Sequence, residues 1–205
     1  MKKSLPPTPA TTTRVGSGRK VNRREDILVA AARLFSSKGY QGTTIRDIAD
    51  AVDMRSGSTF YHFESKHALL EAVVVTGIDS IHAQVAAARK LPGAPAQLFA
   101  RMVSAHLKSL LSAKGRDYAA VMLHESHHLQ AETAAIITTR FTAYEQMWDE
   151  TLSQLQAAGL LKGDMRLSRQ LLLGALNWTT IWYDPGKQST PDDIAVQLCR
   201  LVLHG

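Results

Sequence analysis

The sequence predicts an all-α protein of about nine helices, in which a small helix-turn-helix domain precedes a larger helical domain. Three observations support this fold class. Apolar residues recur at helical spacing almost without interruption from Val21 onward, no segment alternates as a strand would, and glycine and proline breakers separate the periodic stretches. The chain has 205 residues, 45% of them hydrophobic, which is enough for a small domain joined to a larger one.

The first half of the pattern contains four helices of different length. The first carries an apolar stripe and ends at Gly39, because a glycine after the last periodic residue is a common helix stop. Thr44 then caps a short helix, and a break around Asp53 precedes a second short helix over about 55–62. A longer helix begins at about Lys66 and runs into the 80s.

The remaining helices are longer and are separated by clear breakers. The strongest is Leu91-Pro92-Gly93-Ala94-Pro95, and Gly115 with Arg116 predicts a further break. Ser168 is the expected cap of one late helix, and proline after a threonine cap at 190–191 is a typical start for the last. The expected helices cover about 96–112, 117–128, 131–158, 168–183 and 191–204.

The two short helices at 44–62 have the form of a helix-turn-helix, whose second helix enters the major groove of DNA. Gly57 and Ser58 lie in the first turn of that second helix. Small residues let a helix end approach a duplex closely, and its free N–H groups suit phosphate oxygens. The formal charge is +6, and residues 1–24 contain seven cations and no acid. Double-stranded DNA is therefore the expected partner.

These patterns divide the chain into three parts. We expect residues 1–20 to form a disordered basic arm, 21–66 the DNA-binding domain, and 67–205 a domain for ligand binding and dimerisation. The single cysteine, Cys199, excludes an internal disulfide and fits a reducing compartment. The start lacks the apolar segment of a secretory signal, and no run reaches the length of a transmembrane helix. The prediction is a cytoplasmic protein with no membrane partner.

Residues 25–72 resemble the N-terminal domain of the TetR family of transcriptional regulators. The stretches REDILVAAARLFSSKGYQGTTIRDIA and FYHFESKHALL carry the resemblance, because the spacing of their aromatic, glycine and threonine residues fits. The resemblance implies a homodimer that binds a palindromic operator and is released by a small ligand in the C-terminal domain. Repression is the usual outcome in this family, and activation is the alternative.

The basic arm and the resemblance together give a set of expected DNA contacts. Arg55 stands where the family often has a serine or threonine cap, and its guanidinium is able to pair bidentately with guanine. Asp53 stands where glycine is frequent, and Phe60 where tyrosine is frequent. The expected contacts are Arg19, Lys20, Arg23, Thr44, Arg55, Ser56, Ser58, Thr59, Tyr61, His62 and Lys66.

The stretch GALNWTTIWYDPGKQSTPDDIA at 174–195 is similar to a subgroup of the family linked to fatty-acid or steroid side-chain breakdown. The similarity implies a small hydrophobic effector such as an acyl-CoA thioester, and no cofactor. A sterol-like ligand or a drug-like cation also fits an apolar pocket. The expected pocket residues, which would also suit a plain core, are Phe99, Met102, Val121, Met122, Arg140, Phe141, Tyr144, Trp148, Asn177 and Trp178.

The last two expected helices, 168–183 and 191–204, are apolar over more than one face. A surface helix needs one apolar stripe, so the excess predicts burial against a partner subunit. Two helices from each subunit would form an isologous two-fold interface; the alternative is that these helices cross the core. The expected interface residues are Leu172, Leu176, Leu198, Leu201 and Val202.

His124-Glu125-Ser126-His127-His128 supports a different function. It matches H-E-x-x-H, in which two histidines one helical turn apart bind zinc and the glutamate acts as general base. A zinc-binding protein or hydrolase is therefore the alternative, and a protein that organises any duplex is a second rival. No third ligand fits a known signature, so we expect no catalytic residue, no metal and no enzyme activity.

Overall fold

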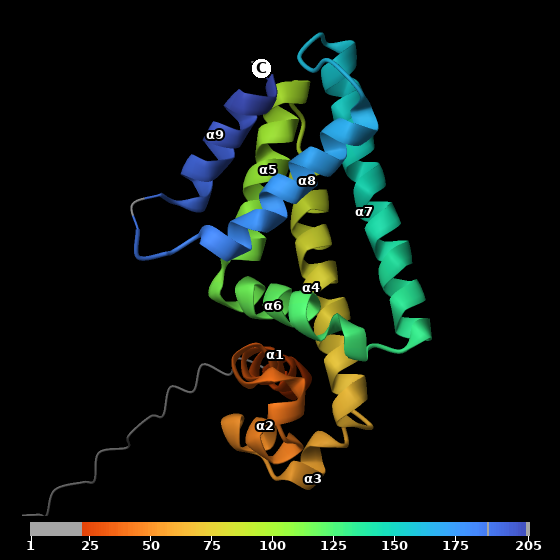
Figure 1. Ribbon diagram of the computed structural model, residues 1–205, viewed down its shortest axis with the longest axis vertical. Coiled ribbons are helices and arrows are strands. Elements are labelled where there is room, and N and C mark those ends of the chain that lie inside the picture. Colours follow the sequence, from red (N-terminus) through yellow and green to blue (C-terminus); the bar gives the residue numbers. More distant parts are fainter. Residues whose placement is uncertain (1–21, 188, 204–205) are drawn as a thin grey trace, which may run out of the picture.

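Nine α-helices and one short 3₁₀ helix form the part of the chain that the structure describes, residues 22–187 and 189–203 (Figure 1). The computed structural model has no strand in these residues, so the predicted all-α class is confirmed. The helices are α1 (Arg23–Gly42), α2 (Ile45–Ala51), α3 (Ser56–Thr59), α4 (Lys66–Arg89), α5 (Pro95–Leu111), α6 (Ala113–Glu125), the 3₁₀ helix η1 (Ser126–His128), α7 (Ala131–Ala157), α8 (Met165–Trp182) and α9 (Pro191–Leu203).

Helix α4 joins a small group of helices to a larger one. Figure 1 shows α1, α2 and α3 at one end of the molecule and α5, α7, α8 and α9 at the other, with α4 running from one group into the other. Helix α6 lies across the molecule between the groups and contacts both α1 and α4. Helices α4 and α6 therefore connect the larger group of helices to the smaller one.

Two apolar cores support these groups, and α4 contributes to both. Val73 of α4 belongs to the core around α1 and α2, and Val85 belongs to the core of α5, α7, α8 and α9. Tyr118 and Val121 of α6 pack in the first core, so α6 shares its packing with the DNA-side helices. The domain boundary at 66/67 stays a prediction.

The capping residues explain where several helices begin and end. Thr44 accepts a hydrogen bond from the N–H of Asp47, and the Asp47 carboxylate accepts one from the N–H of Thr44, as in a capping box. The Ser65 hydroxyl accepts a hydrogen bond from the N–H of Ala68 at the start of α4. Gly39 has φ of 75°, a backbone that glycine adopts without strain, and it interrupts α1 where the stop was predicted. The helical ribbon resumes for one short turn beyond it.

Two predicted starts were wrong because a capping residue upstream was overlooked. Helix α6 begins at Ala113, since the Ser112 hydroxyl accepts a hydrogen bond from the N–H of Gly115, which lies in the first turn instead of breaking the helix. Helix α8 begins at Met165 because Asp164 is its cap. Ser168, the predicted cap, lies inside that helix.

One helix corrects the expectation that no run could cross a membrane. Helix α4 has 24 residues and a mean hydropathy of 1.3 over its best window, so by length and composition alone it would span one. In the fold it contacts α1, α5, α6 and α7, and Leu69, Leu70 and Val73 are fully buried. Its apolar character is therefore that of a helix shared by two protein cores.

Candidate DNA-binding surface and ligand pocket

Helices α2 and α3 form the predicted helix-turn-helix, and the turn between them depends on one unusual residue. Asp53 has φ of 53°, in the left-handed region that favours glycine. Among the described residues, it is the one residue other than glycine with a positive φ. Aspartate adopts this conformation more readily than most side chains. The sequence interpretation of Asp53 as a residue in a glycine-type bend is therefore confirmed.

The surface around α3 presents polar and aromatic side chains to solvent. Arg55, Ser56 and Ser58 are exposed, and Arg55 makes no capping hydrogen bond, so its guanidinium is available. Tyr61 is 96% exposed and Phe60 is 50% exposed. A guanidinium, two hydroxyls and a phenol on one exposed turn provide donors for phosphates and base edges.

Thr59 is a correction to the predicted DNA contacts. Its side chain is fully buried, because it lies on the face of α3 that packs into the domain, so it cannot face a groove in this structure. Its carbonyl accepts hydrogen bonds from the N–H groups of His62 and Phe63, which continue the turn. Thr59 therefore supports the short helix instead of reading DNA.

Lys66 has a structural role that the sequence did not suggest. Its ammonium donates to the carbonyl oxygens of Tyr40 at 2.7 Å and Thr43 at 2.8 Å, which satisfies acceptors at the end of α1. One of its three hydrogens remains, so a phosphate contact stays a prediction. The contacts predicted for Arg23, Thr44 and His62 also stay predictions, and Arg19 and Lys20 lie outside the described residues.

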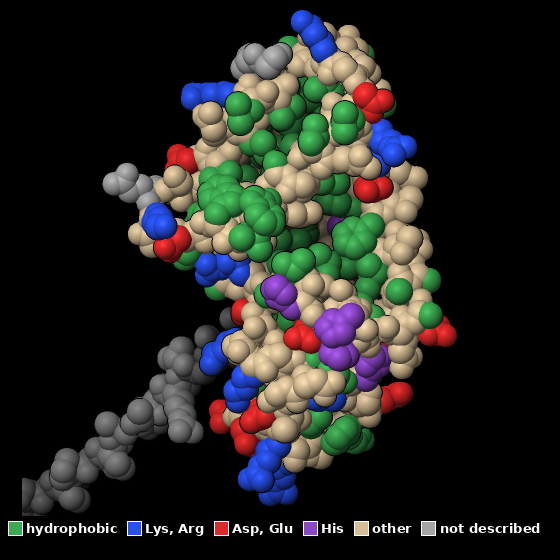
Figure 2. Space-filling view, viewed as in Figure 1, with side chains coloured by type: hydrophobic (Ala, Val, Ile, Leu, Met, Phe, Trp, Pro, Cys, Tyr) green, Lys and Arg blue, Asp and Glu red, His purple; other side chains and the backbone are tan. Residues whose placement is uncertain are grey.

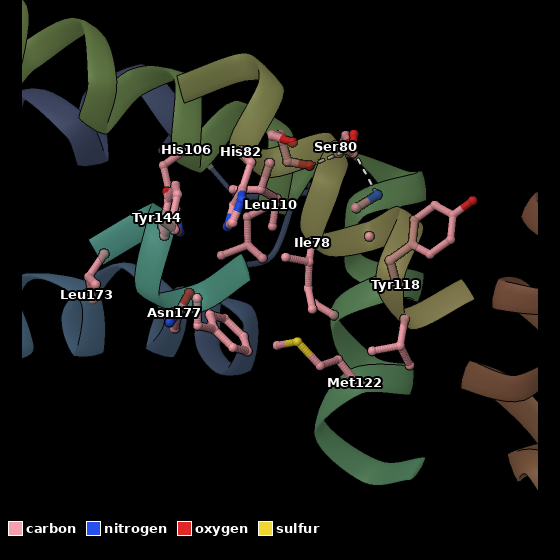
Figure 3. Close-up of a pocket in the computed structure, with 18 of the residues that line it drawn as sticks. Ile78, Ser80, His82, His106, Leu110, Tyr118, Met122, Tyr144, Leu173 and Asn177 are labelled. Carbon is pink, nitrogen blue, oxygen red and sulfur yellow. Dashed lines mark hydrogen bonds between the residues drawn. The ribbon is translucent and has the colours of Figure 1, made fainter. Parts of the chain in front are cut away.

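A cavity of about 370 Å³ lies among α4, α5, α6, α7 and α8 (Figure 3). This volume is in the range of small-molecule sites, which are mostly apolar with a few polar groups. Two groups of polar side chains line the cavity, and Ser80, Glu145 and Gln170 are further polar residues on a mostly apolar wall. The apolar wall includes Val74, Ile78, Leu110, Met122, Phe141 and Leu173.

Two histidines and a tyrosine form the first polar part of the cavity. His106 Nδ1 lies 2.6 Å from the Tyr144 hydroxyl, and the His82 ring stacks on the Tyr144 ring with 4.4 Å between centroids. The Nε2 atoms of both histidines have no hydrogen-bond partner among the described residues. A neutral imidazole has one donor and one acceptor nitrogen, so a ligand oxygen is able to complete the set.

Burial decides the charge of this polar part. It lowers the pKa of His106 to about 4, and Asn177 beside the ring offsets only part of the drop. The pKa of His82 is also lowered, chiefly by burial. Burial raises the pKa of Tyr144 above its usual range. The three groups are therefore neutral near pH 7, and they suit a carbonyl or hydroxyl group better than a carboxylate.

The second polar part is the corner between α5 and α6. Ser109, Ser112 and Gly115 line the cavity there together with Lys114. Among the described residues, Lys114 is the one basic side chain, lysine or arginine, that lines the cavity. Its ammonium lies 2.9 Å from a carboxylate oxygen of Glu25 in α1. An anionic group of a ligand would be able to pair with the Lys114 ammonium at this corner.

The cavity brings together only part of the predicted pocket. Met122, Phe141, Tyr144 and Asn177 line it. The other predicted pocket residues do not line the cavity, because the sequence of an apolar helical face does not show whether that face packs in a core or lines a cavity. Phe99, Met102, Val121 and Trp148 are fully buried in the two cores, Arg140 pairs with Asp79, and Trp178 is 64% exposed.

Sequence reasoning missed His82, His106 and Lys114. Each histidine follows an apolar residue of its helix, Ile81 or Ala105, but other polar residues flank both, so there was little signal in the sequence. Lys114 lies beside the supposed break at Gly115, so its helix was not recognised.

Two family models together match most of the chain. The model described as bacterial regulatory proteins, tetR family, matches residues 27–73. The model described as tetracyclin repressor-like, C-terminal domain, matches residues 92–205, which is more than half of the chain. The chain belongs to the TetR family. The helix-turn-helix lies in the first matched region, and the α5–α8 walls of the cavity lie in the second.

Individual proteins and solved structures are similar to most of the chain. The HTH-type transcriptional repressor KstR2 of Rhodococcus jostii (strain RHA1) is 28% identical, covering 98% of this chain and 97% of KstR2. The structure of AibR in complex with isovaleryl coenzyme A and operator DNA has a TM-score of 0.77 at 27% identity, covering 88% of this chain and 98% of AibR. The structure of superantigen PfiT has a TM-score of 0.75 at 34% identity, covering 89% and 96%.

This TetR chain exposes an apolar face on its last two helices. On α8 the exposed fractions are 67% for Leu171, 64% for Trp178 and 50% for Trp182. Leu201 on α9 is also exposed. Figure 2 shows hydrophobic side chains gathered over this part of the molecule. Such a patch is larger than the scattered apolar residues of most monomers and favours a partner surface.

Most of the residues predicted for the subunit interface do not lie on this exposed apolar face. Leu172 and Leu176 are buried in the chain's own core, because they lie on the opposite side of α8 from Trp178. Leu198 and Val202 are partly buried against the same core. Among the predicted interface residues Leu201 is exposed; Trp178, also exposed, was predicted for the pocket, and Trp182 was not assigned a role.

The H-E-x-x-H stretch does not form the helical motif of a zinc hydrolase. Helix α6 ends at Glu125 and the 3₁₀ helix η1 follows, so His124 and His128 do not lie one turn apart on a continuous α-helix. Glu125, His127 and His128 come together instead, without His124. The regulator KstR2 and the family models give no support to the hydrolase alternative.

Proposed function

We propose that this protein is a homodimeric transcriptional repressor that binds a palindromic operator and leaves it when a hydrophobic effector fills the cavity. The observation that carries the proposal is the position of the cavity, whose walls include α4 and α6. These helices also pack in the core of the DNA-side helices. An effector with different affinity for two arrangements of α4 and α6 shifts the population of the DNA-binding one.

The DNA-binding part of the proposal assigns base reading to α3. Arg55, Ser56 and Ser58 would face the major groove, and Tyr61 and Thr44 would contact the backbone. Arm residues Arg19 and Lys20, together with Arg23, His62 and Lys66, would add contacts to phosphates or groove edges. In a dimer, two such helices enter successive major grooves about one helical turn apart.

The effector we propose is an acyl-CoA thioester. AibR was solved with isovaleryl coenzyme A and operator DNA, which supports this class for a chain of the same fold. The cavity would hold the acyl group, and the phosphates of coenzyme A would lie toward the Lys114 corner, since the rest of the cavity wall carries no cation. A carbonyl or hydroxyl on the acyl group would pair with His106 or His82.

We also propose that the protein has no enzymatic activity and works in the cytoplasm. The family match and the KstR2 relative support a regulator. The rival of a non-selective DNA-organising protein predicts equal affinity for any duplex, which the same experiment measures.

The test is fluorescence anisotropy on the intergenic DNA beside the protein's own gene, with a scrambled duplex as control and salt varied. The proposal expects binding to the intergenic DNA at least about a thousandfold tighter than to the scrambled duplex. A series of acyl-CoA thioesters of increasing chain length should then release the DNA. Equal binding to both duplexes would overturn the regulator, and specific binding that no thioester releases would overturn the effector class.

A further inference from the structure

Three side chains with metal-binding atoms meet where α6 ends. The ligand atoms of Glu125, His127 and His128 all lie within 4.8 Å of one another. Glu125 Oε2 and His128 Nε2 are 3.6 Å apart, and the two histidine rings have centroids 4.0 Å apart. Figure 2 shows histidine side chains gathered on the face that carries this segment. The regulatory function proposed above does not use this cluster.

The cluster exists because the chain changes helix type at this point. Helix α6 ends at Glu125, and the tighter turn of η1 brings His127 and His128 back over it. The His128 side chain is 26% exposed and that of Glu125 is 14% exposed, so both are held by their surroundings. His127 is exposed and is free to turn toward them.

We propose that Glu125, His127 and His128 bind one Zn²⁺ ion. Tetrahedral ligands at zinc bond lengths of about 2.1 Å are about 3.4 Å apart, so separations of up to 4.8 Å must shorten by at most about 1.4 Å, a change that the exposed His127 side chain is able to make. Two imidazoles and a carboxylate suit zinc, whereas calcium and magnesium prefer oxygen ligands alone. Three protein ligands leave the fourth position to water.

The site lies at the junction of the two groups of helices. The His128 ring packs on Tyr40 near the end of α1, with 4.9 Å between centroids. Glu125 lies against Gly39, where an added Cβ would be 3.5 Å from its carboxylate. The Tyr40 carbonyl in turn accepts a hydrogen bond from Lys66, the first residue of α4. A bound ion would therefore fix the end of α6 against the end of α1, directly before the helix-turn-helix.

A second pair of titratable side chains, His67 and Glu71, lies near the cluster but is separate from it. His67 lies near Tyr40, with 6.5 Å between ring centroids, and its Nε2 is 3.4 Å from the Glu71 carboxylate. Glu71 also accepts a hydrogen bond from Thr133. His67 Nε2 makes no hydrogen bond among the described residues despite its approach to Glu71, and neither residue belongs to the group of Glu125, His127 and His128.

The site differs from the sequence motif in one residue, which makes it testable. The H-E-x-x-H motif requires His124 and His128, whereas the structure places His127 with His128 and leaves His124 outside. His124→Ala is therefore a matched control, because it removes a histidine from the same five residues without removing a ligand.

The experiment is calorimetric titration of Zn²⁺ into full-length, chelator-treated protein that carries no histidine tag. We expect one Zn²⁺ per chain, with affinity reduced about tenfold or more in His127→Ala and in His128→Ala and unchanged in His124→Ala. Zn²⁺ should also raise the Tm of the parent and of His124→Ala, because a ligand that binds the folded state stabilises it, and should raise it less in His127→Ala.

Two results would overturn the proposal. One is a parent protein that binds no stoichiometric Zn²⁺, and the other is a His124→Ala variant that loses as much affinity as His127→Ala. His127 is exposed, so His127→Ala keeps the packing of His128 on Tyr40, and circular dichroism of each metal-free variant checks that it is folded. These results are independent of operator binding, so they do not depend on the function proposed above.

Discussion

Lys114 Nζ lies 2.9 Å from Glu25 Oε1, which connects the rim of the cavity to the first turn of α1. The two side chains are 44% and 57% exposed, so the pair itself contributes about 0–1 kcal/mol to stability. Its position matters more than its strength. An anionic effector at the α5–α6 corner would compete with Glu25 for the same ammonium, and α1 would then lose one contact to the ligand side.

We therefore expect Lys114→Met to weaken the response to an acyl-CoA thioester while operator binding without effector stays within about threefold. The concentration for half release should rise on the order of tenfold, because one charged hydrogen bond to a phosphate is lost. The measurement is release of labelled operator DNA. Lys108→Met is the matched control, since Lys108 pairs with Asp192 at 2.8 Å and does not line the cavity. Equal responses in the two variants would contradict this role.

The surface around α3 gives a second prediction. Arg55→Ala should reduce operator affinity on the order of tenfold or more, because a base-reading guanidinium contributes about 1–3 kcal/mol of discrimination. Tyr61→Ala should also weaken binding, and its side chain is 96% exposed, so the folded state should be little affected. Anisotropy on operator and scrambled DNA measures both. Lys162→Ala removes an exposed cation from the α7–α8 loop and should bind as the parent does.

How far the sequence predicts this structure depends on the kind of signal. Local signals worked: the cap at Thr44, the helix stop at Gly39 and the bend at Asp53 each follow from the chemistry of one residue and its neighbours. The start at Ala113 was missed because the Ser112 cap precedes a helix with weak apolar periodicity, and the start at Met165 was missed because Ser168 is a second residue able to cap, four residues after Asp164.

Placement on one side of a helix was harder to predict, because it depends on the neighbours of that helix. Trp148 and Tyr144 lie one turn apart on α7, yet Trp148 fills the core and Tyr144 faces the cavity. Leu172 and Trp178 share α8, but the first is buried and the second exposed. Apolar residues cover both sides of these helices, so the sequence could not assign core, cavity and partner surface.

The buried histidine predicts a specific pH dependence of stability. His106 has a pKa of about 4 in the folded protein, lowered by burial, against 6.5 for an ordinary histidine. Between these values the unfolded chain binds a proton that the folded chain does not, so the free energy of unfolding falls as the pH drops from 6.5 toward 4 and this contribution levels off below that. Its full size is on the order of 3 kcal/mol.

The His106→Gln variant isolates this contribution from that of the carboxylates. It should lose less stability than the parent between pH 7 and pH 4.5, by an amount on the order of 2 kcal/mol, as measured by urea unfolding at both values. His124→Gln changes an exposed histidine and should keep the parental difference. A His106→Gln protein with the parental difference would show that His106 has the same pKa in the folded and the unfolded chain.

The exposed aromatic face of α8 predicts the last result. Trp178 is 64% exposed and lies on the same side of α8 as Leu171 and Trp182, so a second copy of the chain would bury all three. Trp178→Asp places a charge at the centre of that contact and should convert the dimer to a monomer in sedimentation at micromolar concentration, because an unpaired charge is costly to bury. Ile136→Asp changes a residue of α7 that is 45% exposed and should leave the dimer intact. Since a palindromic operator is read by two copies of α3, the monomer should also lose most of its operator affinity while retaining its helical circular dichroism spectrum. A Trp178→Asp protein that still sediments as a dimer would mean that another surface joins the subunits.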